Sequence, residues 1–134
     1  MLQSNSYRYK DGLVYRNQYC VIFCPKYRRK VLVNGVDIRL KEIMYETAKE
    51  NDIILNSIDV MPDRVHLSIE VDPRIAVHIA IRELKARSSR ILREEFPWLK
   101  SKIPSLWTRS YFCCSVGDVS EAAVEKYIED QKNK

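Results

Sequence analysis

Two short strands joined by a tight turn are predicted by the stretch Ser57-Ile-Asp-Val-Met-Pro-Asp-Arg-Val-His-Leu-Ser-Ile-Glu70. Pro62 and Asp63 suit the two central turn positions, because proline pre-sets φ at the first and aspartate is favoured beside it. On both sides of the turn, apolar and polar residues alternate, which is the pattern of strands with one buried face. The apolar members are Ile58, Val60, Val65, Leu67 and Ile69.

The register of this hairpin brings a histidine and a carboxylate together. If Met61 pairs with Arg64, Asp59 lies opposite His66, and such neighbours have Cβ atoms about 5 Å apart. The polar face then carries Arg64, His66, Ser68 and Glu70. A histidine facing a carboxylate suits metal or phosphate chemistry. The alternative is an ordinary surface histidine on an exposed strand.

Composition places the chain among globular proteins. Its 134 residues are 46% hydrophobic and 31% charged, which predicts one domain over residues 1–134 with its own core. No apolar run approaches the roughly 20 residues that span a bilayer, and no secretory signal opens the chain, so we expect a cytoplasmic protein without a membrane partner.

The net charge of +5 is compatible with a phosphate-bearing partner. The chain has Cys20, Cys24, Cys113 and Cys114, without a C-x-x-C pair, which favours buried, reduced thiols over a zinc site.

The remaining elements follow from periodicity. Residues 1–10 are predicted to be a loose arm, and a β-forming run ends at Pro25. A helix is predicted over residues 36–51, a second from Asp72 and Pro73 to about Phe96, and a last one over about residues 119–132. An irregular link lies between Pro97 and Pro104, followed by a strand over residues 106–116, and D-x-x-E spacing at 118–121 predicts a capping box.

This order predicts an α+β, ferredoxin-like (RRM-like) fold. Two helices would cover one face of an antiparallel sheet, and the extra C-terminal helix could lie across the other. Tyr127 and Gln131 share one face of that last helix, because they are four residues apart.

Positive charge is concentrated in two places. Lys26-Tyr-Arg-Arg-Lys30 follows the first buried strand, and its tyrosine could stack on a base. The exposed face of the second helix carries Lys85 and several arginines. An anion-binding surface and a merely solvated charge run both remain open for each.

Four stretches together resemble the insertion-sequence 200/605 class of transposases, the small single-tyrosine HUH enzymes. They are Phe-Cys-Pro-Lys-Tyr-Arg-Arg-Lys-Val-Leu (23–32), Val-Met-Pro-Asp-Arg-Val-His-Leu (60–67), Leu-Lys-Ala-Arg-Ser-Ser (84–89), and Leu-Trp-Thr-Arg-Ser-Tyr-Phe (106–112) with the downstream Tyr-Ile-Glu-Asp-Gln (127–131). The resemblance runs from about residue 15 to the end of the chain.

The resemblance implies a homodimeric enzyme that recognises single-stranded DNA hairpins and requires a divalent metal, Mg²⁺ or Mn²⁺. Tyr127 would attack a phosphodiester and form a 5′-phosphotyrosine, while His66 and Gln131 would be metal ligands. The DNA contacts implied by position are Lys26, Arg28, Arg29, Arg64, Lys85 and Arg109. Such a protein would associate with the nucleoid when bound to DNA.

One position departs from the family pattern. Arg64 stands where the first histidine of the HUH pair is expected, and arginine cannot ligate a metal. Three outcomes are open: Asp59 supplies the missing ligand, Arg64 itself contacts the scissile phosphate, or the chain is a decayed copy that binds DNA or RNA hairpins without cutting them.

Overall fold

The structure is a computed structural model that describes residues 7–134. Residues 1–6, the larger part of the predicted arm, lie outside the described residues. The end of that arm is not loose, because strand β1 (Arg8–Lys10) pairs with β2 (Leu13–Tyr15). Asp11 and Gly12 join the two strands with φ values of 49° and 80°, as a two-residue hairpin turn requires, and Asp-Gly is a strong signal for such a turn.

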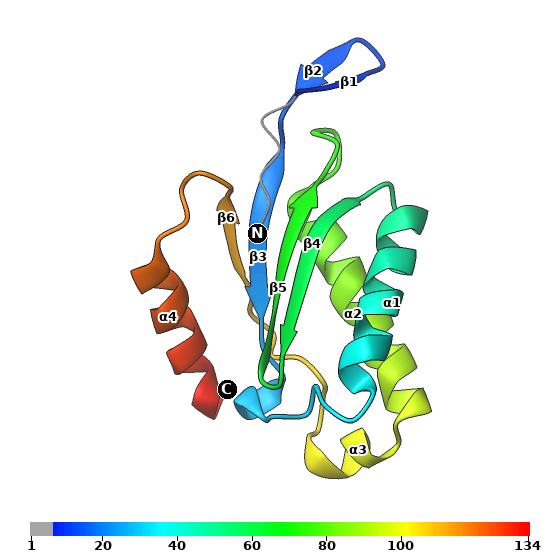
Figure 1. Cartoon of the computed structure of the whole chain (residues 1–134), viewed down its shortest axis with the longest axis vertical. Coiled ribbons are helices and arrows are strands. Elements are labelled where there is room, and N and C mark those ends of the chain that lie inside the picture. Colours follow the sequence, from blue (N-terminus) through cyan, green and yellow to red (C-terminus); the bar gives the residue numbers. More distant parts are fainter. Residues whose placement is uncertain (1–6) are drawn as a thin grey trace.

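Four strands form the central sheet: β3 (Gln18–Phe23), β4 (Ile54–Met61), β5 (Arg64–Glu70) and β6 (Phe112–Ser115). Their order is β4-β5-β3-β6, and every neighbouring pair is antiparallel. Helices α1 (Val36–Glu50) and α2 (Val77–Glu95) lie together on one face of the sheet (Figure 1). The predicted α+β, ferredoxin-like fold is confirmed.

The core lies between that face and the two helices. Val65, Leu67 and Ile69 alternate along β5 and are fully buried, as the period-2 pattern predicts. In α1 the buried residues recur at steps of three and four, so one stripe of the helix packs on the sheet; they are Val36, Leu40, Ile43, Met44, Thr47 and Ala48. Burying a side chain such as Leu40 stabilises the fold by about 1.5–3 kcal/mol.

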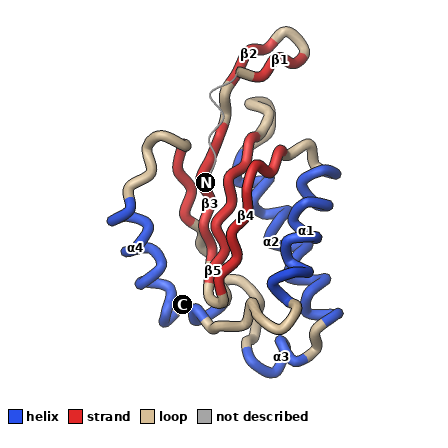
Figure 2. The backbone as a smooth tube through the Cα atoms, in the orientation of Figure 1, coloured by secondary structure: helices blue, strands red, loops and turns tan. Residues whose placement is uncertain are grey.

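The central hairpin has the predicted register. Asp59 lies opposite His66, and Met61 lies opposite Arg64. The hairpin therefore displays one polar face, on the side of the sheet that α1 and α2 leave uncovered. Helix α4 (Glu121–Asp130) does not lie across the middle of this side; it stands beside edge strand β6, close to the C-terminus (Figure 2).

Several predicted boundaries were wrong. Helix α2 begins at Val77 rather than at Asp72, because Asp72 accepts hydrogen bonds from the backbone and guanidinium of Arg74 in a preceding turn. These bonds also hold the pKa of Asp72 well below its usual range. The link between the two prolines contains a short helix, α3 (Trp98–Lys102), with Pro97 at its N-cap.

The last third of the chain also differs in detail. The predicted strand over residues 106–116 is regular only in β6, although Trp107 forms an isolated bridge with Pro25. The capping box was wrong as well: Ser120, not Asp118, is the N-cap of α4 and accepts a hydrogen bond from the Ala123 amide. A 3-10 turn, η2 (Gln131–Asn133), follows α4.

All four cysteines are free thiols; Cys20 and Cys24 are buried, whereas Cys113 and Cys114 are half-buried. Among residues 7–134, no helix is both long and apolar enough to cross a membrane.

Candidate active site

Tyr127 and Gln131 face the body of the protein from α4 and η2. They lie one helical turn apart, and the Gln131 Nε2 donates to the Tyr127 backbone carbonyl at 3.0 Å. Gln131 is 3% exposed, whereas α4 itself has no buried residue. The two polar side chains therefore lie on the inner side of α4, where Val124 and Ile128 are also half-buried.

Ser110 connects both side chains. Its Oγ donates to the Gln131 Oε1 at 3.0 Å and lies 3.0 Å from the Tyr127 hydroxyl oxygen. Because the single hydroxyl proton of Ser110 is used toward Gln131, the Tyr127 hydroxyl must be the donor in the second bond. Tyrosine, serine and glutamine thus form a closed ring of three hydrogen bonds that holds the phenol in place.

The phenol of Tyr127 rests in its protonated form. Burial raises its pKa, and the hydrogen bond with Ser110 only partly opposes this. A protonated phenol is a weak nucleophile, so any attack by this oxygen requires that the proton leave as the new bond forms.

Lys85 fixes the loop that carries Ser110. Its Nζ donates to the carbonyls of Thr108 at 2.7 Å and Ser110 at 3.0 Å, with a longer contact to Arg109 at 3.4 Å. Burial lowers its pKa to about 8. The Lys85 ammonium is already engaged by backbone oxygens, which gives this residue a positioning role for residues 108–110.

The polar face of the sheet leads from His66 to Tyr127. His66 on β5 lies opposite Asp59 on β4 and Ile22 on β3, and Ile22 lies opposite Phe112 on β6. Directly opposed residues point to the same face. The Tyr127 ring is 6.1 Å from the Phe112 ring. The fold therefore places His66 and Tyr127 on the same side of the sheet, with β3 and β6 between them.

His66 is neutral and has a free ring nitrogen. Its Nε2 is buried without a hydrogen-bond partner among residues 7–134. Burial lowers its pKa, the Arg64 cation lowers it further, and Asp59 opposes them. A buried neutral imidazole whose Nε2 has no partner among the described residues fits a metal ligand.

The other donors fit a divalent cation less completely. Within the described chain no three or more His, Cys, Asp or Glu side chains form a metal cluster. A site here would therefore combine His66 and Asp59 with the Gln131 amide oxygen, which retains a second lone pair beyond its bond with Ser110. Arg64 adds a fixed positive charge on the same face and so weakens cation binding.

Arg64 is held at the hairpin turn. Its Nη1 donates to Asp63 Oδ1 at 2.9 Å, while its buried Nε has no partner among the described residues. Arg28, in the 3-10 turn η1 (Lys26–Arg28), contacts the same Asp63 at 3.3 Å. Arg28 also donates to the Ile128 carbonyl at 3.3 Å, so it ties the end of α4 to the hairpin.

The remaining predicted DNA contacts lie on the surface around this centre. Lys26 packs over the ring of Tyr27, with its Nζ 5.0 Å from the ring centroid. Arg29 and Arg109 are exposed. Sequence reasoning missed Ser110 and the loop role of Lys85, since a serine in an irregular segment and a lysine on a basic helix carry no periodic signal of a tertiary contact.

Known proteins that resemble this chain are transposases. The family model described as "Transposase IS200 like" matches residues 13–131. The ISDra2 transposase TnpA of Deinococcus radiodurans is 38% identical over 125 residues, which cover 92% of this chain and 89% of that protein. The IS200 transposase of Salmonella typhimurium is 28% identical over 116 residues, covering 85% of this chain and 76% of the relative.

Solved structures show the same relationship. A crystal structure of a Deinococcus radiodurans protein described as a transposase superposes with a TM-score of 0.86 at 34% identity, covering 95% of this chain and 99% of that one. A REP-associated tyrosine transposase bound to a REP hairpin shares the fold, with a TM-score of 0.56 at 11% identity, and the match covers 98% of this chain and 70% of that one. By the family match and the 38% identity, this chain belongs to the IS200-like transposases.

Proposed function

We propose that this protein is a DNA transposase that binds single-stranded DNA hairpins at the ends of an insertion sequence and cleaves and rejoins strands through Tyr127. The observation that carries the proposal is the hydrogen-bonded ring of Tyr127, Ser110 and Gln131. It orients one phenol toward the sheet side that also presents the orphaned Nε2 of His66.

The proposed reaction exchanges one phosphate ester bond for another. The Tyr127 Oη bonds to the phosphorus of a phosphodiester, the P–O3′ bond breaks, and a 5′-phosphotyrosine and a free 3′-hydroxyl result. The phenolic proton leaves toward Ser110 and solvent, and a proton is taken up by the departing 3′ oxygen. Attack of a 3′-hydroxyl on the phosphotyrosine reverses the step, so strands are rejoined without ATP.

A divalent cation is part of the proposal. Held by His66, Asp59 and Gln131, Mg²⁺ or Mn²⁺ would act as a Lewis acid that neutralises charge developing on the phosphate. Arg64 occupies the position of a family histidine by the resemblance, and a guanidinium there supplies part of the same neutralisation through phosphate hydrogen bonds. The Arg64 side chain is 31% exposed, which supports that second role.

The proposed partners follow from the family and the charge. The REP-associated transposase is bound to a hairpin, which supports a DNA hairpin as ligand here. A homodimer, a cytoplasmic location and nucleoid association on DNA binding belong to the same proposal.

Arg64 also favours a second candidate. A cation in the place of a metal ligand is what a decayed copy would carry if it bound DNA or RNA hairpins without cutting them. In that case Tyr127 would be dispensable, whereas the basic residues would not.

A hairpin-cleavage assay distinguishes an active transposase from a decayed copy that only binds hairpins. A 3′-labelled single-stranded hairpin is incubated with Mg²⁺ or Mn²⁺ and run on a denaturing gel, because the protein stays on the 5′ phosphate of the labelled fragment. We expect a covalent band that Tyr127→Phe abolishes while hairpin binding persists. A band given only by Arg64→His would identify a decayed transposase. Binding without a band in either protein would favour the hairpin-binding module and contradict the strand-transfer proposal.

A further inference from the structure

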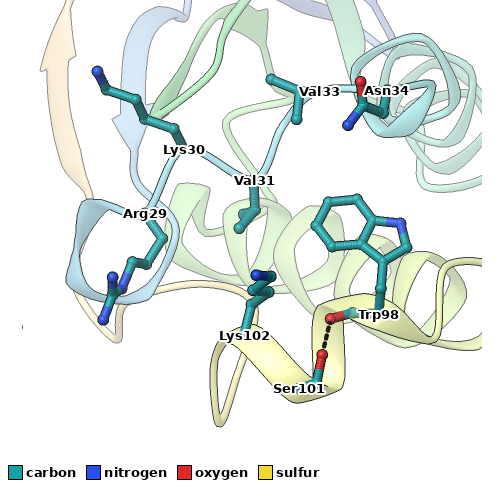
Figure 3. Close-up of a pocket in the computed structure, with 8 residues that line it drawn as sticks. All are labelled: Arg29, Lys30, Val31, Val33, Asn34, Trp98, Ser101 and Lys102. Atoms are coloured by element: carbon teal, nitrogen blue, oxygen red, sulfur yellow. Dashed lines mark hydrogen bonds between the residues drawn. The ribbon is translucent and has the colours of Figure 1, made fainter.

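A basic cleft lies between the loop of residues 29–34 and helix α3. Its volume is about 720 Å³. Arg29 and Lys30 line the cleft from the loop, and Lys102 lines it from α3. In Figure 3 the side chains of Arg29 and Lys30 leave the loop in different directions, and the indole of Trp98 lies beside Val31. No carboxylate is among the residues that line the cleft. The resemblance and the proposed active site assign it no role as a whole, because only Arg29 belongs to the predicted DNA contacts.

The cations of the cleft are unpaired. Across residues 7–134, neither Arg29, Lys30 nor Lys102 takes part in an ion pair or a side-chain hydrogen bond, and all three are exposed. Elsewhere in the protein arginines are commonly neutralised, for example Arg39 by Glu95 and Arg74 by Asp72. Three unneutralised cations around one hollow create a local positive potential that favours phosphate.

Trp98 adds a flat apolar surface to this charge. Its side chain is partly buried and packs against the core, so one part of the indole is covered and the rest is accessible. Ser101 is engaged through its donation to the Trp98 carbonyl at 2.7 Å. Asn34, with a φ of 56° before Gly35, presents a side-chain amide in the same cleft. An indole and an amide suit the face and the edge of a nucleobase.

The cleft is continuous with the C-terminal end of α4, the helix that carries Tyr127. Arg29 and Lys30 also line a neighbouring hollow together with Lys132 and Asn133 of η2. Gln131, the residue before Lys132, bonds with Ser110 and with the Tyr127 backbone. The neighbouring hollow therefore joins the cleft to η2, the turn that directly follows the helix carrying Tyr127, although Lys132 itself is paired with Glu129.

We propose that this cleft binds an unpaired nucleotide of the single-stranded DNA that reaches Tyr127, with phosphates on Arg29, Lys30 and Lys102 and a base stacked on Trp98. The proposal rests on the proposed function, since the ligand is the same DNA. Single-stranded rather than duplex DNA is the ligand because stacking on an indole needs a base whose face is free.

Tryptophan fluorescence tests the cleft directly. The chain has two tryptophans, and Trp107 is 6% exposed with its Nε1 donating to Ser88 at 3.0 Å. Titrating the Tyr127→Phe protein with an oligothymidylate of about eight nucleotides should quench Trp98 emission, because a stacked base quenches an indole. Trp98→Leu should abolish the quenching and weaken binding about 5- to 100-fold.

Two lysines on α3 form a matched pair. Lys102→Ala should weaken binding and lower the slope of log affinity against log salt by about 0.7, the value for one phosphate contact on a single strand. Lys100→Ala should change neither quantity, because Lys100 is exposed on the same helix but does not line the cleft. Thermal melts establish that each variant is folded, and the surface variant Lys102→Ala decides the matter if Trp98→Leu is unstable.

Three further ligands separate the contributions of base and charge. Abasic single-stranded DNA should bind without quenching, and duplex DNA should quench weakly. Equal quenching by polyglutamate would overturn the proposal in favour of an acidic protein partner. Unchanged DNA affinity in both Trp98→Leu and Lys102→Ala would also overturn it, even if hairpin cleavage proceeds. Quenching without any covalent band would instead contradict only the strand-transfer chemistry.

Discussion

Helices α1 and α4 lie at opposite sides of the same sheet and are held by different forces. Helix α1 buries six side chains, among them Leu40 and Ile43, which are 0% exposed. Helix α4 buries none. It is held by the bonds of Ser110 with Tyr127 and Gln131 and by Arg28 at its C-terminal end. The residue proposed to do the chemistry therefore sits on the least buried long helix.

The free energies of burial and of hydrogen bonding show how differently α1 and α4 are stabilised. Each fully buried aliphatic side chain contributes about 1.5–3 kcal/mol, whereas a net intramolecular hydrogen bond contributes about 0.5–1.5 kcal/mol. The sheet with α1 and α2 is thus a stable frame, and α4 is docked on it by a few kcal/mol at most. Such an element opens locally far below the free energy of global unfolding.

The same substitution on the two helices should show this contrast most clearly. Ile43→Ala in α1 should lower the free energy of unfolding by about 2–5 kcal/mol, because it leaves a cavity in a fully buried site. Ile128→Ala in α4 should lower it by about 1 kcal/mol, since Ile128 is only half-buried. Guanidinium chloride unfolding followed by circular dichroism measures both. Equal losses would show that α4 belongs to the cooperative core.

Ser110→Ala should weaken the docking of α4 and leave the hydrophobic core unchanged. It removes the bonds to Tyr127 and Gln131 and leaves a buried amide oxygen without its donor, so docking should weaken by about 1–3 kcal/mol. Hydrogen exchange should accelerate in α4 and stay unchanged in α1. Cleavage should fall by up to about 100-fold through misplacement of the phenol.

Ser115→Ala is the control, because Ser115 is an exposed serine on β6. Hydrogen exchange in α4 of Ser110→Ala that is no faster than in Ser115→Ala, or unaltered cleavage, would contradict the role of the hydrogen-bonded ring.

The stable frame is also the part that sequence predicts well. The alternation through Val65, Leu67 and Ile69 and the stripe through Leu40 and Ile43 arise from burial on one face, which leaves a periodic trace in the chain. The register of Asp59 and His66 follows from a two-residue turn at Pro62 and Asp63, as the structure confirms. Local rules and tertiary packing agree in these elements.

The weakly docked part leaves a fainter trace. Ser110 and Lys85 matter through single hydrogen bonds between segments far apart in the chain, and no spacing encodes such bonds. Tyr127 and Gln131 were identified by the resemblance and by their four-residue spacing rather than by burial. The N-cap of α4 was misplaced by two residues because Asp118 and Ser120 are both good capping residues and only tertiary geometry selects between them.

That N-cap offers a smaller perturbation of α4. Ser120→Ala removes the acceptor for the Ala123 amide and should cost about 1 kcal/mol of helix stability. The first turn of α4 should exchange faster, with little change in the melting temperature of the frame. Ser120→Asp should restore protection, because aspartate caps equally well and favours the positive end of the helix dipole. Fraying in both variants to the same extent would argue against capping at this position.

Because Lys85 titrates, raising the pH should increase global stability but loosen the loop of residues 108–110. Its pKa in the folded protein is about 8, against an ordinary value of 10.5, because burial disfavours the cation. Between these values the unfolded chain binds more protons than the folded one, so the Lys85 contribution to global stability rises with pH across this window. The burial penalty is complete below pH 8 and is relieved as the side chain loses its charge.

The loop of residues 108–110 responds the other way. A neutral amine has two N–H donors where the ammonium has three, so the carbonyls of Thr108, Arg109 and Ser110 are held less tightly above pH 8. Cleavage should therefore decline a few-fold with a midpoint near pH 8, while resistance to guanidinium chloride does not decline with it. Lys85→Met keeps the length of the side chain and should remove this midpoint from the profile. An identical alkaline decline in Lys85→Met would mean that Ser110 is positioned independently of Lys85, and that the tyrosine helix is anchored by its own bonds alone.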